Sequence, residues 1–424
     1  MNYNKTKIKE GITIHNIKTN KFKTNLYAVF IAMPLDRETV TKNALLAAIL
    51  RRGTNNIKSQ DQISKKLEEM YGASFDCGIE KTGDNHIMKF YLEALNEKFL
   101  PTKEELTKQC VDLLFDIIFN PLVENNGFKS EYVESEKKNL KQIIESKIDD
   151  KRRYSFERCV EEMFKNEPYG LYRYGYVEDL ESITPESLYQ YYNQMINECK
   201  IDIFASGEIE QEEINNIITS NKEIAKLKER NAKYVPYKEQ ATPKHIKDVN
   251  VVEEHKQVGQ GNLVIGLSAN SNIENARYIT SVYNAILGGG ANSKLFQNVR
   301  EKESLAYTAG STYRRQKDAI FIRCGIEIAN YEKALKTIEK QIEDIKNGEF
   351  TDEDVNNSKE LIISSIRSIS AVQDTEITYY YGQELSEKFV SVDEYLEKIN
   401  NVKKEDIKEV AKNMDVNTVY FLRD

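Results

Sequence analysis

The segment FKSEYVESEKKNL at residues 128–140 has a counterpart in FTDEDVNNSKELI at residues 350–362. An offset of 222 positions aligns the phenylalanine that starts each segment and the valine five positions later. Acidic residues come early in both segments, as is typical of the first turns of a helix. Two such similar stretches, this far apart, suggest that the chain contains one structural unit twice.

A second pair of segments supports this duplication. Residues 176–195, YVEDLESITPESLYQYYNQM, resemble residues 391–414, SVDEYLEKINNVKKEDIKEVAKNM, when they are shifted by 219 positions. This shift places Ile183 on Val402 and aligns the methionines that end the two segments. Each segment predicts a helix and is followed by a short strand pattern, CKIDIFASG in one case and VNTVYFL in the other.

Further strand patterns keep the same order in both halves. Strand pairs are predicted at residues 73–95 and 309–329, and apolar strands are predicted near residues 25–35 and 262–270. The sequence therefore predicts an α+β fold of two homologous halves. In each half we expect a mostly antiparallel sheet covered by helices on one side.

The boundary between the halves is predicted from a change in composition. Residues 220–248 are highly charged, contain two prolines and have no sustained apolar face, which is typical of an exposed connector. We therefore place an N-terminal half at residues 1–222, a connector at residues 223–246 and a C-terminal half at residues 247–424.

Composition excludes several classes of protein. The net charge is -8, and basic and acidic residues alternate along the chain, so we expect no nucleic-acid partner. No apolar run is long enough to cross a bilayer, so we expect no membrane association and a cytoplasmic protein. Five scattered cysteines without CxxC spacing predict neither a disulfide framework nor a thiolate metal site.

Two helices are predicted in the N-terminal half after its first apolar strand. Residues 39–54, TVTKNALLAAILRRGT, are apolar on almost every side, which predicts a buried helix. The next helix begins after Ser59, which forms a capping pattern with Gln62, and ends at Gly72.

With these features, essentially the whole chain resembles the insulinase/pitrilysin family of zinc peptidases, which includes the mitochondrial processing peptidases. The most specific segment is LGGGANSKLFQNVREKESLAY at residues 287–307, which is similar to a signature of glycines, an arginine and a tyrosine in that family's C-terminal half. A second match is the RRGT end of the buried helix, in the place where the family carries its zinc-binding helix.

The predicted zinc helix departs from the family pattern. Active members carry HxxEH, two histidine ligands one turn apart and a glutamate general base. Matching the RRGT end places these three residues at Ala44, Ala47 and Ala48, whose methyl groups cannot bind zinc or transfer a proton. The four histidines are nowhere paired at i and i+4. We therefore expect no metal site and no cofactor in this chain.

The family's third zinc ligand is a glutamate on a later helix, and the resemblance places it at Glu136. Other glutamates lie nearby in the sequence at positions 131, 134 and 145. We interpret Glu136 as part of a solvated helix face and do not count it as a metal ligand.

The resemblance also implies roles for Arg300 and Tyr307. In the family these residues lie across the substrate chamber from the zinc, where they bind the peptide backbone and stabilise the oxyanion. From the residues alone, Arg300 could equally have a solvated head group and Tyr307 could be one of many core tyrosines.

Some branches of the family pair a zinc-bearing chain with a chain that supplies the arginine and tyrosine. This sequence is similar to the second kind, so the resemblance predicts a protein that is inactive alone. Its expected partners are a homologous subunit with HxxEH and an extended peptide substrate, and zinc is expected in that subunit. The alternative is a stand-alone peptide-binding or structural interaction protein without a role in catalysis.

The three glycines at residues 288–290 suggest a phosphate-binding loop, but the spacing GxxxxGK[ST] is absent. We interpret them as the end of an apolar helix at which the backbone adopts positive φ, with Ser293 starting the next helix.

Overall fold

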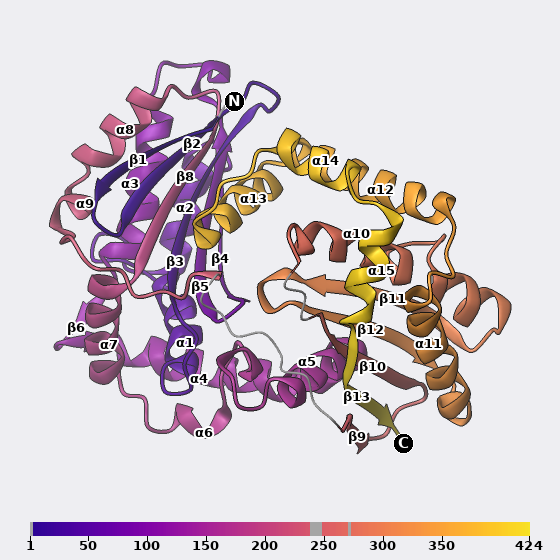
Figure 1. Ribbon diagram of the computed structural model, residues 1–424. Coiled ribbons are helices and arrows are strands. Elements are labelled where there is room, and N and C mark those ends of the chain that lie inside the picture. Colours follow the sequence, from indigo (N-terminus) through magenta and orange to yellow (C-terminus); the bar gives the residue numbers. More distant parts are fainter. Residues whose placement is uncertain (1–2, 238–247, 270–272) are drawn as a thin grey trace. The chain divides into compact units, whose positions relative to one another are not determined.

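The computed structural model describes residues 3–237, 248–269 and 273–424, which form two compact units (Figure 1). Unit 1 comprises Met1–Glu145, Leu171–Pro236 and Ala371–Leu385, and unit 2 comprises Ser146–Gly170, Tyr237–Ser370 and Ser386–Asp424. Within the described ranges, no helix combines the length and apolar character that crossing a bilayer requires.

The sheet of unit 1 has six strands in the order β1-β2-β8-β3-β5-β4. All neighbours are antiparallel except β2 and β8, which are parallel. The strands are β1 (Tyr3–Lys9), β2 (Ile12–Lys18), β3 (Thr24–Pro34), β4 (Ser74–Thr82), β5 (Asn85–Leu95) and β8 (Lys200–Gly207). A separate short hairpin consists of β6 (Val123–Glu124) and β7 (Gly127–Phe128).

The sheet of unit 2 has five strands in the order β11-β12-β10-β13-β9. Only β13 and β9 are parallel. The strands are β9 (Asn250–His255), β10 (Gly261–Ser268), β11 (Ala306–Arg314), β12 (Ala319–Ile326) and β13 (Asp415–Arg423).

The two sheets have the same topology once β1 is set aside. The order β2-β8-β3-β5-β4 corresponds strand by strand to β9-β13-β10-β12-β11, and the parallel pair occupies the same place in both. The duplication and the mostly antiparallel sheets predicted from the sequence are therefore present, and β4, β5, β11 and β12 form the two predicted strand pairs.

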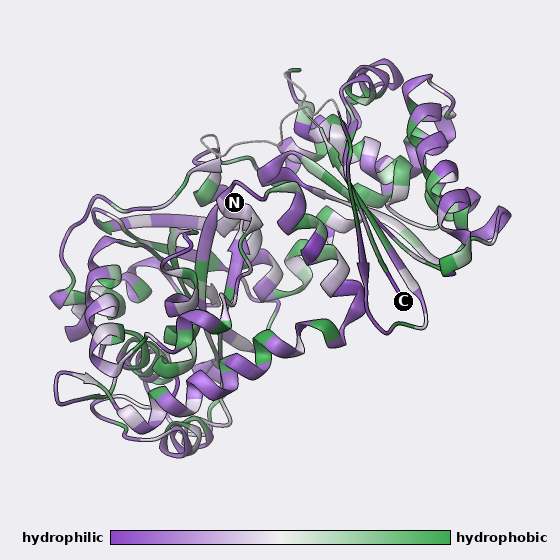
Figure 2. Cartoon of the chain, turned by 90° about the horizontal axis from the view of Figure 1, so that it is seen from below, coloured by the Kyte–Doolittle hydropathy of each residue, from purple (hydrophilic) through white to green (hydrophobic). Residues whose placement is uncertain are grey.

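Helices bury one face of each sheet and form its main core. Unit 1 has α1 (Val40–Leu50), α2 (Gln60–Glu69), α3 (Leu106–Phe119), α4 (Ser130–Glu145), α6 (Val177–Leu180), α7 (Pro185–Glu198), α8 (Gln211–Ser220) and α9 (Lys222–Lys226). Unit 2 has α10 (Ala276–Gly288), α11 (Tyr331–Lys346), α12 (Asp352–Arg367), α14 (Val392–Asn400) and α15 (Lys404–Lys412). Apolar residues concentrate on the strands and on one side of many helices (Figure 2).

The opposite face of the unit 1 sheet is covered by α13 (Gln373–Ser386), a helix from the C-terminal half of the chain. Val29 and Ile31 point into the main core, so Phe30 between them points to the other face. There it stacks on Tyr381 of α13, with ring centroids 4.1 Å apart. Gln373 of the same helix donates to the carbonyl of Ser206 at 2.9 Å.

The second face of the unit 2 sheet is covered in the same way by α5 (Lys151–Met163), from the N-terminal half. Cys159 and Val160 form a small core with Phe321 and Tyr420 of the sheet. Phe156 packs edge-on against Phe321 with centroids 5.2 Å apart. Each sheet is thus covered on both sides, and not on one side as the sequence predicted.

These two helices also make the units differ from the predicted ranges 1–222 and 247–424. Residues 146–170 pack with unit 2, and residues 371–385 pack with unit 1. The predicted connector, 223–246, includes most of α9, which packs in unit 1, while residues 238–247 lie outside the described residues.

Candidate functional site

Helix α1 holds the three positions that carry HxxEH in active members of the family. It packs against β4 and α4, and Ala44 and Ala47 are each only 5% exposed. The Cys77 thiol of β4 donates to the carbonyl of Ala47 at 3.3 Å, and burial raises the pKa of this thiol to about 12. The contact between α1 and β4 therefore offers methyl groups from α1 and a protonated thiol from β4, which do not fit a zinc ion.

Glu136 on α4 is 8% exposed, so the interpretation of this residue as part of a solvated face is wrong. Its Oε1 lies 3.4 Å from Nε of Arg52, and its Oε2 accepts a hydrogen bond from Asn139 at 3.2 Å. The guanidinium of Arg52 also lies over the ring of Tyr132. An arginine thus balances the carboxylate that the resemblance aligns with the family's third zinc ligand.

Arg300 lies on a helix, η5 (Leu295–Lys302), that has π geometry. Its side chain is 43% exposed, and its guanidinium carbon lies 4.5 Å from the centre of the Phe296 ring. Its Nε lies 3.6 Å from Oε1 of Glu301. Helices of π geometry occur often at functional sites, and here the wider turn carries an arginine whose charged end reaches solvent.

Tyr307 lies at the start of β11 and is 61% exposed, so it is not a core tyrosine. The register between β11 and β12 shifts between Ala306 and Thr308, which makes Tyr307 the extra residue of a β-bulge. Bulges turn side chains away from the regular sheet direction and are frequent beside active sites. The hydroxyl of Tyr307 makes one long hydrogen bond, donated to Glu327 at 3.4 Å.

The structure presents Arg300 and Tyr307 from neighbouring elements of unit 2. The helix η5 packs against β11, and the amide of Leu305 donates to the carbonyl of Val299 at 2.9 Å. Leu305 and Val299 are buried, and they anchor the turn that joins the two elements. Both candidate residues therefore project from one corner of the unit, although no hydrogen bond joins them in the described structure.

The glycines at 288–290, which precede η5, have a different structural role from the one predicted. Gly289 has a φ of −79°, and none of the three glycines at 288–290 adopts a left-handed conformation. A β-carbon on Gly288 would lie 2.5 Å from the amide nitrogen of Ser311 in β11. Glycine is therefore needed where the end of α10 approaches a strand closely. The next helix begins near the predicted Ser293, whose carbonyl accepts from Gln297.

The described histidines have structural partners. His86 is buried between the side chain of Asn43 and the carbonyl of Arg173, and burial lowers its pKa to about 3. His255 contacts the carbonyl of Asp424. His245 lies outside the described residues.

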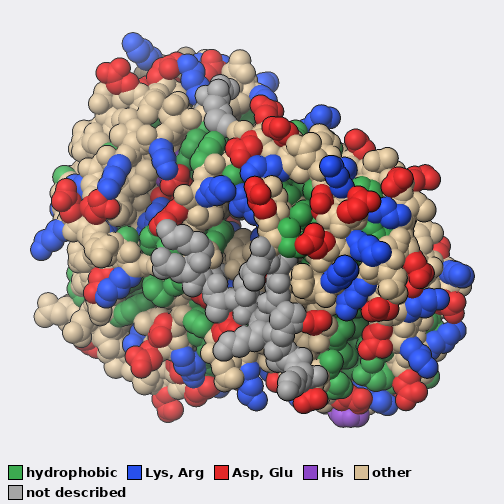
Figure 3. Space-filling view, in the orientation of Figure 1, with side chains coloured by type: hydrophobic (Ala, Val, Ile, Leu, Met, Phe, Trp, Pro, Cys, Tyr) green, Lys and Arg blue, Asp and Glu red, His purple; other side chains and the backbone are tan. Residues whose placement is uncertain are grey.

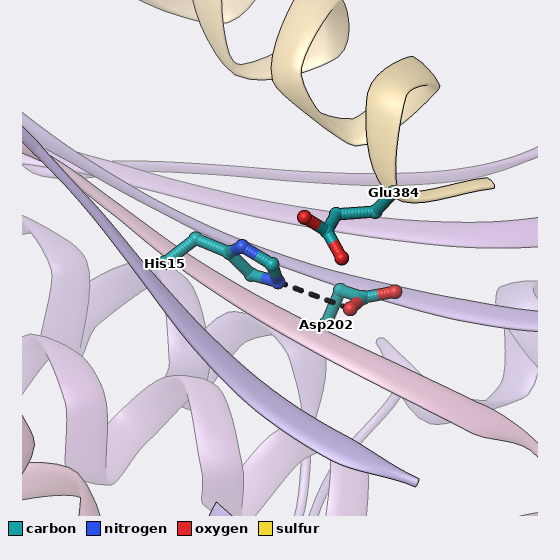
Figure 4. Close-up of side chains that lie close together, drawn as sticks. All are labelled: His15, Asp202 and Glu384. Carbon is teal, nitrogen blue, oxygen red and sulfur yellow. Dashed lines mark hydrogen bonds and ion pairs between the residues drawn. The ribbon is translucent and has the colours of Figure 1, made fainter. Parts of the chain in front are cut away.

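His15 belongs to a polar cluster under α13 that the sequence analysis missed (Figure 4). Its Nε2 lies 3.0 Å from Asp202 of β8, and the nearby carboxylate of Glu384 comes from α13. These three are the one group of potential metal ligands found within the described ranges. The signal in the sequence was polar residues at 15 and 202 within otherwise apolar strand patterns.

Lysines already compensate both carboxylates of this cluster. Lys200 donates to Asp202 at 2.5 Å, and Lys5 donates to Glu384 at 2.9 Å. Burial alone would raise the pKa of Asp202, but Lys200 and His15 hold it down at about 2. A divalent cation would add charge to a balanced group, so we interpret the cluster as the attachment of α13 to the sheet.

Comparisons with known proteins agree with this geometry. A family model described as "Peptidase M16 inactive domain" matches residues 182–362. A Bacillus subtilis protein named "Probable inactive metalloprotease YmfF" is 34% identical over 419 residues, which cover 97% of this chain and 96% of that protein. An "Uncharacterized zinc protease" of Rickettsia felis is 23% identical over 420 residues, covering 96% of this chain and 93% of that protein.

Solved structures share the fold along the whole chain. A conserved protein from Enterococcus faecalis V583 has a TM-score of 0.90 and 27% identity, and the match covers 100% of this chain and 99% of that chain. A structure of a "peptidase M16 inactive domain" from Pseudomonas fluorescens has a TM-score of 0.79 and 16% identity, covering 100% of this chain and 98% of that chain.

Fold, site and relatives together define the class as an inactive M16 peptidase-like protein. The chain belongs to the M16 family of insulinase/pitrilysin-like peptidases, and it is a member without the HxxEH zinc motif.

Proposed function

We propose that this chain is the zinc-free subunit of a two-chain M16 peptidase. In such a complex it supplies Arg300 and Tyr307 to an active site whose zinc is held by a homologous partner with HxxEH. The observation that carries the proposal is a contrast within the chain. The zinc helix presents buried methyl groups, whereas Arg300 and Tyr307 are both largely exposed and weakly engaged.

The chemistry of these two side chains suits peptide hydrolysis by a zinc ion in the partner. A guanidinium has several donors in a planar fork that fits carbonyl oxygens, and a phenol adds one donor on a stiff arm. Donors aimed at the oxyanion of the transition state are worth about 10²–10³-fold in rate. The substrate class is an extended peptide, because β4 and β11 are sheet edges with unpaired backbone groups that an added strand can bind.

The test is to purify the chain from its native cell and to identify what copurifies. We expect a homologue of similar size that carries HxxEH, together with peptidase activity that a chelator abolishes. Arg300→Ala or Tyr307→Phe should lower this activity by at least about tenfold at unchanged melting temperature. Lys302→Ala is the matched control, because Lys302 is exposed on the same helix and should leave activity unchanged.

Two results would contradict the proposal. Recovery of the chain without any M16 homologue would favour the stand-alone interaction protein. Loss of stability in parallel with loss of activity would show that Arg300 and Tyr307 act by packing, for example through the contact with Phe296. The cytoplasmic location that the composition suggests remains a prediction.

A further inference from the structure

A pocket of about 380 Å³ lies in unit 2, over β10, β11 and β12 and next to the first turn of α5. Its lining includes Arg152 of α5, Arg323 of β12 and Asn262 of β10, and none of the described residues that line it is acidic. Pockets for small ligands and for single side chains of larger ones are of this size or somewhat larger. Neither Arg300 nor Tyr307 lines the pocket, although Thr308, the next residue after Tyr307, does.

Glycines keep this pocket open. Gly310 and Gly325 lie on β11 and β12 at the base of the pocket. A β-carbon at Gly325 would lie 2.9 Å from Nε2 of Gln260 and 3.2 Å from Oγ1 of Thr308. Side chains at these two positions would fill part of the pocket and crowd its polar groups. The two glycines therefore leave space in the pocket for part of a ligand.

The arginines of the pocket have no acidic partner. Within the described ranges, no ion pair links Arg152 or Arg323 to a carboxylate, whereas two other arginines of α5 are paired. Arg153 pairs with Glu157 at 3.1 Å, and Arg158 binds three glutamates at 2.6–3.1 Å. Of the three arginines on α5, the one that lines the pocket is therefore also the one without an ion pair in the described ranges.

An aromatic ring positions part of this positive charge. The guanidinium carbons of Arg323 and Arg314 lie 5.6 and 5.3 Å from the centre of the Phe156 ring. Partial burial and the charge of Arg314 lower the pKa of Arg323, so the two cations repel each other without a compensating anion. The only hydrogen bond that Arg323 donates within the described structure is a long one of 3.4 Å to Thr312. A bound anion would relieve this repulsion and use the remaining donors.

The pocket adjoins the open edge of the sheet. Among the strands of the described ranges, β11 pairs only with β12, so alternate backbone groups along its other side have no partner in those strands. A peptide that adds to this edge would place one side chain beside Gly310, where β11 itself has none. The end of α10 also approaches this position, since a β-carbon at Gly310 would lie 3.2 Å from the carbonyl oxygen of Gly288. Arg323 lies on the same face of the sheet as Gly310, because the two residues are directly opposite in the strand register.

We propose that the pocket binds a carboxylate of an extended peptide that pairs with β11. The carboxylate is either an acidic side chain opposite Gly310 or the C-terminus of a peptide that ends there. The inference rests on the proposed function only in taking a peptide as the ligand, and it requires neither a partner subunit nor cleavage.

The test uses the full chain and labelled nonapeptides of Ser, Thr and Val, with binding measured by fluorescence anisotropy. One peptide has a central Glu and a second has Gln instead, and both are blocked at the two ends. A third has the Gln sequence with a free C-terminal carboxylate. We expect either carboxylate-bearing peptide to bind about tenfold more tightly than the blocked Gln peptide, with a preference that falls at high salt. Which of the two is preferred identifies the source of the carboxylate.

Variants then locate the preference. Arg323→Gln and Arg152→Gln should each reduce it to about threefold or less, while the matched control Arg153→Gln, one residue along α5, should retain it. Equal binding of all three peptides, or no binding of any, would overturn the proposal even if every variant were unstable. So would an unchanged preference in folded Arg323→Gln protein. Because no partner is present, these outcomes are independent of the activity test with Arg300 and Tyr307.

Discussion

The ion pair between Arg52 and Glu136 should contribute measurably to stability, since both side chains are largely removed from solvent. The side chains are 27% and 11% exposed, and the Nε–Oε1 distance is 3.4 Å. At an effective dielectric constant of about 20, two unit charges at this distance attract each other by about 5 kcal/mol. Desolvation offsets part of this attraction, and breaking a fully buried pair costs about 3–5 kcal/mol. Because Arg52 is partly exposed, we expect Arg52→Met to destabilise the chain by about 2 kcal/mol.

The assay is urea denaturation followed by circular dichroism, because the chain contains no tryptophan. Methionine retains an apolar stem but removes both the charge and the contact of the guanidinium with the Tyr132 ring. Glu136→Gln keeps a side chain that can still accept from Asn139 and should cost about 1 kcal/mol, because Arg52 can turn toward solvent. The double variant should cost less than the sum of the single ones, with a coupling of about 1–2 kcal/mol.

Additive effects of the two substitutions would refute this reasoning. So would a loss below about 0.5 kcal/mol for Arg52→Met, which is the range of an ordinary surface substitution. Glu136 would then have to be stabilised by its other neighbours, and Arg52 would have no part in replacing the metal. Lys138→Met is a suitable control, because Lys138 is exposed on the same helix.

Three further results are expected. Burial lowers the pKa of His86 from 6.5 to about 3, so the stability that comes from keeping this ring neutral is complete above pH 6.5 and is lost as the pH falls toward 3. His86→Gln should therefore make the urea midpoint depend less on pH over that range. An unchanged pH dependence of the midpoint would contradict this. Two polypeptides, residues 1–240 and 241–424, should copurify when they are coexpressed, because unit 1 includes residues 371–385 and unit 2 includes residues 146–170. Elution as two separately folded monomers in gel filtration would contradict this prediction. Elemental analysis should find no stoichiometric zinc in the chain. Introducing HxxEH at positions 44–48 should create a zinc site only when Arg52 is also replaced. One tightly bound zinc ion in the unaltered chain would contradict the interpretation that α1 and its neighbours do not bind zinc.

The parts of the fold that follow from local pattern were predictable from the sequence. The repeated helices at 128–140 and 350–362 and the matching strand pairs required only periodicity and order. Similar sequence patterns in the two halves correspond to the same strand order in the two sheets, which is why pattern and order were enough to predict the duplication. Charged residues of both signs also mix on the face shown in Figure 3, as the interleaved sequence predicts.

The exchange of α5 and α13 could not be predicted in this way. An amphipathic pattern indicates that a helix buries one side, but it does not say which sheet it covers. Both helices are adjacent in the sequence to elements of the other unit, so proximity along the chain was misleading. The contacts that decide their places, such as Phe30 with Tyr381 and Phe156 with Phe321, join residues 351 and 165 positions apart.

Sequence reasoning about the candidate site failed where the answer depended on a neighbour in space. The residues next to Glu136 in the sequence resemble those next to the exposed glutamates of α4. Glu136 is buried because it lies on the side of α4 that faces Arg52. The sequence suggests that Gly288 ends a helix through a positive φ, whereas in the structure a glycine is required there because β11 lies too close for a β-carbon. The bulge that exposes Tyr307 depends on the register with β12, which one strand cannot specify.

The region that the resemblance aligns with the family's zinc site differs from the family pattern in more than three alanines. Removing two histidines and a glutamate from α1 would leave the carboxylate of Glu136 buried without a positive partner, which is costly for stability. Arg52 lies just beyond the end of α1 and supplies that partner from the same stretch of chain. The alanines allow α1 to approach β4 closely enough for Cys77 to donate to the carbonyl of Ala47. The site is therefore stabilised as a packed, charge-balanced contact, and an ion that entered it would have to displace an arginine.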